Sequence, residues 1–338
     1  MPERSGASSS SSSPGRARFN PLGPHVVLAS ALIIVLVLMN VLVLAANNPN
    51  RTQGPHYYVA AGDSLSFGYQ PNGDFFRGFA DDLFAELRRA ELSNTKGQQS
   101  VEINLANFGC PAETTNTMIN GGCPRGNFVK QIYFGPQLDA VVTFLTQHKG
   151  NVSPVTFELG VNDVFPGDFD SNSCNISSTS DADLRTMDDN LTRVDDANPN
   201  DPANPKNGIL KRLTDALRVV PPSSGPLPLT PPIIAGDLVM LNYYNPFAQK
   251  CPNSVDFIHT LNDHLAKDAA IFRIPLVDVY TAFGGDANMK ANVCTLTWIC
   301  NSLFHDIHPT DEGYRQIAKA VENVLGYPHP LPAPAPQP

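Results

Sequence analysis

The sequence is poor in positive charge. It contains 23 Lys and Arg against 32 Asp and Glu, which gives a formal net charge of −9 at pH 7. Its second half also lacks a cluster of Lys and Arg of the kind that neutralises a phosphate backbone. These two absences argue against a nucleic-acid partner, and we predict none.

The sequence also lacks the spacings that hold metal ions. No CxxC pair is present, and no paired Cys/His spacing matches a zinc site. Residues 164–207 are rich in Asp, Asn and Ser, but their spacing does not match a calcium-binding loop. We interpret this stretch as a solvated polar insertion, with a calcium site as the alternative. We predict no metal site and no cofactor.

One long hydrophobic run is present, close to the N-terminus. Residues 26–46 are apolar apart from Ser30 and Asn40. About 20 such residues can span a membrane, whereas the apolar core of a signal peptide has about 7–15. Basic residues precede the run and almost none directly follow it, which predicts a chain exported beyond the run. We expect a disordered, basic and Ser-rich N-terminus at 1–25, an anchor or cleaved signal at 26–46 and a linker at 47–55.

The cysteine content agrees with export. The chain has six cysteines, and an even number in an exported domain is typical of disulfides. Many pairings are possible in principle. The simplest set has no nested or crossing loops: Cys110–Cys123, Cys174–Cys251 and Cys294–Cys300.

Short apolar runs alternate with amphipathic segments from residue 56 to residue 327. The runs typical of strands lie at 57–61, 101–105, 155–159, 233–238 and 276–280. Segments with helical spacing lie at 75–87, 136–148, 181–194, 209–219, 255–272 and 311–325. Such alternation predicts one α/β domain, a three-layer α/β/α sandwich around a mostly parallel five-stranded sheet. A Pro-rich, disordered tail follows at 328–338.

Polar side chains suited to acyl transfer lie in three places along this pattern. Ser64 follows the first strand in a Gly-Asp-Ser turn, and Asn162 follows the third strand in Gly-Val-Asn-Asp. Asp306 and His308 come just before the last helix. Because ligands of parallel sheets bind beyond the carboxyl ends of the strands, these side chains are expected to meet. A hydroxyl nucleophile needs a base, the base needs an orienting acceptor, and an amide can hold an oxyanion.

Each motif alone is also an ordinary turn, but their combination is specific. Gly-Asp-Ser-Leu at 62–65, Gly-Val-Asn-Asp at 160–163 and Asp-Ile-His-Pro at 306–309 resemble, in this order, the SGNH (GDSL) hydrolase family. The resemblance extends over roughly 57–325, and Asn-Tyr-Tyr-Asn-Pro at 242–246 resembles a segment of its disulfide-containing, lipase-like members. It implies a flavodoxin-like SGNH-hydrolase fold with Ser64 as nucleophile and His308 as general base. It also implies an oxyanion hole that includes the Ser64 amide and the Asn162 side chain.

The sequence departs from the family pattern at two positions. Ala112 stands where the family has the Gly whose amide completes the oxyanion hole, and Gly109 is the fallback if the register is shifted. His305 stands where many members have the acid, three residues before the base. We therefore assign the orienting role to Asp306, with a backbone carbonyl as the alternative. His305 is either a substrate contact or an exposed loop residue.

The predicted function is hydrolysis of carboxylic esters, of lipids or short acyl chains, through a Ser-His-Asp triad and an acyl-enzyme. Several apolar side chains favour an acyl substrate: Phe67, Phe165, Phe169, Tyr243, Tyr244 and Phe247. Alternatives with the same fold are a carbohydrate O-acetyl esterase and a phospholipase. An alternative from another class is an inactive, membrane-anchored binding module. The expected partners are an ester substrate and, through the N-terminal segment, a membrane, and we expect a monomer.

Overall fold

The computed structural model describes the chain in six stretches, all within the unit Arg51–Pro338. These stretches are residues 56–94, 102–126, 128–165, 167–178, 180–218 and 238–326. Among their helices, none is long and apolar enough to cross a membrane. The predicted N-terminus, anchor or signal, linker and tail (1–25, 26–46, 47–55 and 328–338) lie outside the described residues.

Five parallel strands form the central sheet, in the order β2-β1-β3-β6-β7. The strands are β1 (His56–Gly62), β2 (Ile103–Asn107), β3 (Val152–Glu158), β6 (Leu238–Leu241) and β7 (Leu276–Val277). The three inner strands, β1, β3 and β6, are buried along most of their length, as expected for strands that are covered by helices on either side. The predicted parallel five-stranded sheet is confirmed.

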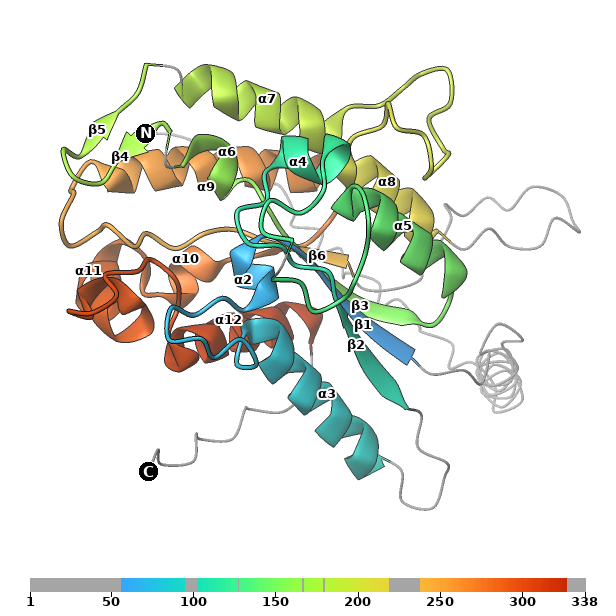
Figure 1. Cartoon of the computed structure of the whole chain (residues 1–338), viewed down its shortest axis with the longest axis horizontal. Coiled ribbons are helices and arrows are strands. Elements are labelled where there is room, and N and C mark those ends of the chain that lie inside the picture. Colours follow the sequence, from blue (N-terminus) through green and yellow to red (C-terminus); the bar gives the residue numbers. More distant parts are fainter. Residues whose placement is uncertain are drawn as a thin grey trace, which may run out of the picture. The chain divides into compact units, whose positions relative to one another are not determined.

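Helices cover both faces of this sheet, which confirms the three-layer α/β/α prediction (Figure 1). One layer contains α3 (Phe79–Asn94) and α12 (Asp311–Leu325), with α10 (Val279–Ala282) and α11 (Gly285–Leu296) packed against α12. The other layer contains α5 (Gln137–Gln147), α7 (Ser180–Thr192), α8 (Ile209–Leu217) and α9 (Ser254–Ile271). The predicted N-cap of α12 is present, because the Thr310 side chain accepts a hydrogen bond from the Gly313 N–H.

Short helices follow the three strands that lead to the site. They are α2 (Ser64–Phe67) after β1, α4 (Thr115–Asn120) after β2 and α6 (Val161–Val164) after β3. Since parallel strands end at the same edge of a sheet, these helices start at one end of the domain.

Two predicted elements have different bounds in the structure. The strand expected at 276–280 ends at Val277, because the Asp278 side chain accepts from the Thr281 N–H and begins α10. The helix expected from Phe75 begins at Phe79. Before it, Gly78 packs so closely on Gly68 that a Cβ would lie 2.4 Å from the Gly68 Cα. This contact holds the preceding segment as a loop.

Of the strand expected at 233–238, residues 233–237 lie outside the described residues, and β6 runs from Leu238 to Leu241. The polar insertion at 164–207 contributes more than a solvated cover. Its helix α7 buries Leu184, Met187 and Leu191 against α8 and α9. The insertion also carries a two-stranded antiparallel hairpin, β4 (Phe169–Asp170) and β5 (Asn175–Ile176).

The three disulfides are those predicted: Cys110–Cys123, Cys174–Cys251 and Cys294–Cys300. The second ties the β4–β5 hairpin to the segment before α9. The first closes a loop that borders the functional site, as described below.

Candidate active site

The turn that carries Ser64 is fixed by a glycine. Gly62 has φ +136° and lies against β3, where a Cβ would be 1.7 Å from the Glu158 carbonyl oxygen. Asp63 then caps α2 by accepting from the Leu65 N–H at 2.9 Å. Ser64 is therefore the first residue of a helix at the carboxyl end of β1, with its side chain partly exposed. This confirms the predicted strand-to-helix position.

Ser64, His308 and Asp306 form a continuous hydrogen-bonded chain. The His308 Nε2 lies 2.8 Å from the Ser64 Oγ, and the His308 Nδ1 lies 2.6 Å from the Asp306 Oδ1. Because a carboxylate can only accept, Nδ1 carries the proton and Nε2 is free to accept from the serine hydroxyl. The Tyr244 hydroxyl donates to the Ile307 carbonyl at 2.7 Å and holds this loop in place.

Asp306 reaches the histidine from only two residues away by forming a local turn. Its Oδ1 accepts from the His308 backbone N–H at 2.8 Å as well as from the ring. Burial opposes ionisation of this carboxyl, but the hydrogen bonds from the His308 ring and backbone, with the electrostatic attraction of that ring, outweigh it and lower the pKa of Asp306. His305 is exposed, has φ +46° and does not line the pocket.

Ala112 adopts the backbone conformation that usually requires glycine, with φ +67°. Within the described part of the chain, neither its N–H nor that of Ser64 donates to a protein acceptor. Both residues line the pocket. The fallback, Gly109, is not suited to the oxyanion hole. Its N–H donates to the Asn107 side chain at 2.9 Å, and it packs tightly against the Ser66–Phe67 backbone.

Asn162 points into the same site from the start of α6. Its Nδ2 donates to the Glu113 carbonyl at 2.9 Å and to the Asp63 Oδ2 at 3.2 Å. Both amide protons are thus engaged in this structure. The side chain is fixed between the segment of Ala112 and the turn of Ser64.

A buried carboxyl pair supports the nucleophile turn. Asp63 and Glu158 are both fully buried and hydrogen-bonded to each other, and the Tyr243 hydroxyl donates to the Asp63 Oδ2 at 3.1 Å. Burial, together with the negative charge of Asp63, raises the pKa of Glu158 well above its ordinary value. Burial beside Asp63 therefore favours the neutral form of Glu158. Our sequence analysis missed Glu158, although a carboxyl at the end of an otherwise apolar strand is a usable signal.

Two further side chains tie the loops of the site together. Gln137 accepts from the Gly62 N–H and donates to the Gly62 carbonyl, both at 2.9 Å, and it also donates to Glu113 at 3.1 Å. Asp163 accepts from the Thr115 N–H at 2.9 Å. Burial raises the pKa of Glu113 to about 7 and that of Asp163 to about 6. These contacts link the segments of Ser64, Ala112 and Asn162.

These residues border a cavity of about 360 Å³ with a mainly apolar lining. Of the apolar residues expected at its mouth, four line it and two, Phe67 and Phe169, are buried outside it. The lining residues are Phe165, Tyr243, Tyr244 and Phe247. All members of the predicted triad and the predicted oxyanion hole line the same cavity.

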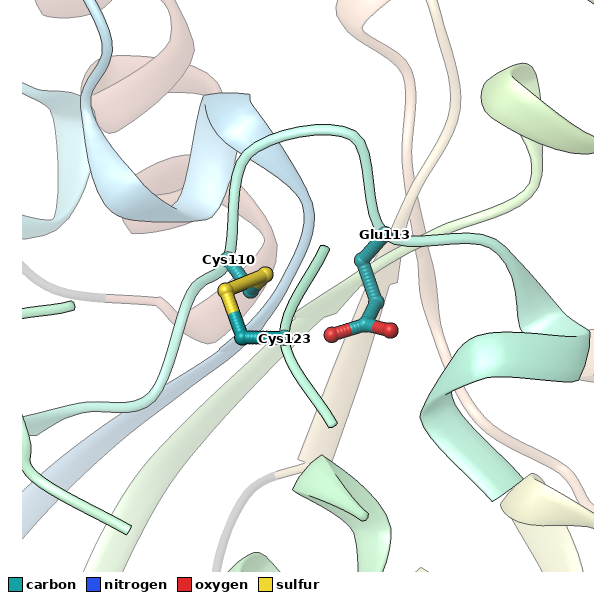
Figure 2. A group of neighbouring side chains, drawn as sticks. All are labelled: Cys110, Glu113 and Cys123. Carbon is teal, nitrogen blue, oxygen red and sulfur yellow. A yellow bond between two sulfur atoms is a disulfide. The ribbon is translucent and has the colours of Figure 1, made fainter. Parts of the chain in front are cut away.

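The group of side chains whose spacing could hold a metal ion, within the described residues, is Cys110, Glu113 and Cys123 (Figure 2). Both sulfurs are joined in a disulfide, which leaves no thiolate to bind a metal. The role of this group is structural. The bond fixes Ala112 on one side and Arg125 on the other, each two residues beyond a cysteine.

The fold is a three-layer α/β/α sandwich with a serine, a histidine and an aspartate hydrogen-bonded at one end of its sheet, and a family comparison assigns the chain. The chain belongs to the GDSL-like lipase/acylhydrolase family, whose family model matches residues 58–321. No curated protein sequence matches the chain.

Similar solved structures include an extracellular lipase from Streptomyces rimosus, with 17% identity, a TM-score of 0.44 and coverage of 80% of this chain and 99% of that one. An acetylxylan esterase from Geobacillus stearothermophilus has 14% identity and a TM-score of 0.43, covering 81% and 96%. Phospholipase A1 from Streptomyces albidoflavus has 16% identity and a TM-score of 0.42, covering 80% and 100%.

Proposed function

We propose that this member of the family is a serine carboxylic ester hydrolase that works through an acyl-enzyme. The observation that carries the proposal is the chain of hydrogen bonds Ser64–His308–Asp306, at 2.8 and 2.6 Å, on the wall of a largely apolar cavity. A nucleophile, its base and an orienting acid within hydrogen-bond reach are the geometry that acyl transfer requires.

In the proposed mechanism His308 takes the hydroxyl proton of Ser64 as the oxygen attacks the ester carbonyl. The oxyanion accepts from the N–H groups of Ser64 and Ala112. The oxyanion also accepts a hydrogen bond from the Asn162 Nδ2. This replaces the bond from Nδ2 to the Asp63 Oδ2, which at 3.2 Å is the longer of the two bonds that Asn162 donates. His308 then protonates the leaving alcohol, and a water molecule activated by His308 releases the acid.

The apolar lining of the cavity favours an acyl chain as the part of the substrate that the cavity binds. Three phenylalanines line it: Phe165, Phe247 and Phe257. The ring centroids of Phe165 and Phe247 lie 5.2 Å apart, and the buried Phe169 contacts both Phe247 and Phe257, at 5.1 and 5.4 Å. Such a lining favours lipid or short acyl esters. Esters of carbohydrates and phospholipids remain alternatives of the same chemistry.

Hydrolysis of a series of p-nitrophenyl esters with short and long acyl chains tests this proposal. Ser64→Ala is expected to lower kcat by roughly 10⁶-fold, and a fluorophosphonate is expected to label Ser64 in the wild-type protein only. Wild-type protein that neither turns over any ester nor reacts with the fluorophosphonate would establish the inactive binding module instead.

We further propose that the enzyme is exported and acts outside the cytoplasm, held by residues 26–46 if that segment is retained. The three disulfides support an oxidising compartment. N-terminal sequencing of the mature protein tests the anchor, since a start near residue 46 would show that the segment is removed.

A further inference from the structure

One cation lines the pocket without a carboxylate partner. Arg125 is exposed and, apart from His308, is the only basic residue among the described residues that line the pocket. Among the described residues, its side chain makes no ion pair and no hydrogen bond. The carboxylates that line the same pocket are already engaged: Asp63 is fully buried in its hydrogen-bond network, and Asp306 is bound to His308.

The neighbouring cations behave differently. Arg77 pairs with Asp311 at 2.6 Å, and Lys130 pairs with Asp81 at 2.7 Å. Arg77 lies in the loop before α3 and Lys130 in the loop before α5, and residues of both loops line this part of the pocket. In a chain with a net charge of −9, Arg125 is therefore the one cation in the described part of these loops that is left available to a ligand.

Contacts place Arg125 on the wall next to the general base. The Phe128 N–H donates to the Arg125 carbonyl at 2.7 Å, and the Phe128 ring contacts Phe75. Phe75 stacks on Tyr69, whose ring centroid lies 4.6 Å from that of His308. The base protonates the leaving group, so this wall lies where the alcohol part of an ester departs. The disulfide Cys110–Cys123 holds the segment in place.

We propose that Arg125 is a specificity-determining residue that binds an anionic group on the alcohol part of the ester. This inference rests on the proposed ester hydrolysis and deepens it. The planar guanidinium binds a phosphate or a carboxylate through two parallel hydrogen bonds. The preferred substrate then combines an acyl chain, for the aromatic side of the pocket, with an alcohol that carries an oxyanion.

Three water-soluble esters with one acyl chain test the proposal: 1-hexanoylglycerol, its 3-phosphate, and the hexanoyl ester of glyceric acid. The measurement is the ratio of kcat/KM for each anionic ester to that for the neutral one. Arg125→Gln is expected to lower this ratio about tenfold, mainly through KM, and Arg125→Lys to lower it less. Loss with the phosphate ester alone, or with the carboxylate ester alone, identifies the anion that the site is built for.

Arg185→Gln is the matched control, because Arg185 is an exposed arginine of α7 that does not line the pocket. It is expected to leave the ratio unchanged. The wild-type ratio is also expected to fall with rising salt, and that dependence to weaken in Arg125→Gln. A ratio that is the same in Arg125→Gln and wild type for both anionic esters would overturn the proposal while leaving ester hydrolysis intact.

A binding measurement tests the role of Arg125 independently of whether the protein hydrolyses esters. Titration calorimetry with 1-hexanoylglycerol 3-phosphate, on Ser64→Ala and on Ser64→Ala/Arg125→Gln, needs no turnover. The second protein is expected to bind about tenfold more weakly. Equal affinities overturn the assignment of Arg125, whether or not the wild-type protein hydrolyses esters.

Discussion

Replacement of Glu113 by Gln is expected to flatten the dependence of stability on pH. Glu113 directly follows Ala112, is fully buried and accepts a hydrogen bond from Gln137. Burial raises the pKa of Glu113 from an ordinary 4.5 to about 7. Between these values the folded state binds the proton and the unfolded chain does not. The stabilisation is therefore complete below pH 4.5 and is lost as the pH rises through 7.

The size of the effect follows from these two pKa values. Linkage gives a loss of about 2.5 kcal/mol in the free energy of unfolding between pH 5 and pH 8 from this one group. Glutamine has the shape of the protonated acid but does not titrate. Glu113→Gln should therefore exceed the stability of the wild type by less than about 1 kcal/mol near pH 5 and by about 3 kcal/mol near pH 8.

Denaturant unfolding of both proteins at pH 5, 6, 7 and 8, with disulfides intact, measures the difference. The exposed Glu102→Gln is the matched control, because it removes a carboxylate from the surface and should leave the pH dependence parallel to that of the wild type. Parallel curves for Glu113→Gln and wild type would refute the reasoning, since they would mean that Glu113 ionises in the folded state without cost.

Three further predictions concern the site. Asp306→Asn is expected to lower kcat by about 10⁴-fold with little change in folding, because the amide cannot hold His308 in the required tautomer; kinetics together with circular dichroism check this. Asn162→Ala is expected to lower kcat by about 10²–10³-fold with a smaller effect on KM, measured on a p-nitrophenyl ester. Cys110→Ser/Cys123→Ser opens a loop with a sequence separation of 13 residues and is expected to cost about 3 kcal/mol of stability, measured by denaturant unfolding.

The sheet could be predicted from the sequence because each strand is a short apolar run. The positions of Ser64 and Asn162 at strand ends could be predicted as well, because each strand end carries its own turn, whereas their roles rest on the family resemblance. The disulfides of the structure are those of the simplest pairing, chosen among many because none of its loops is nested or crossing. His308 and Asp306 lie two residues apart, which kept their relation local as well.

The parts that could not be predicted depend on contacts between distant segments. Helix α3 begins at Phe79 because Gly78 packs on Gly68, a contact that apolar spacing does not encode. Glu158 lies beside Asp63, whose charge helps to raise its pKa, only because β1 and β3 pair side by side. Arg125 lines the pocket because the disulfide Cys110–Cys123 holds its loop there. From the sequence alone, Arg125 cannot be told apart from any other surface arginine.

Contacts between distant segments also explain why an alanine, rather than the glycine of the family pattern, can stand at position 112. An alanine in the left-handed region costs roughly 1 kcal/mol, and glycine would avoid that cost. Here the loop is held on one side by the disulfide of Cys110 and on the other by the bond from Asn162 to the Glu113 carbonyl. Each of these constraints is worth as much as the strain or more. The amide of residue 112 is therefore oriented by its neighbours rather than by the freedom of a glycine, and loss of the disulfide should weaken the oxyanion hole as well as the fold.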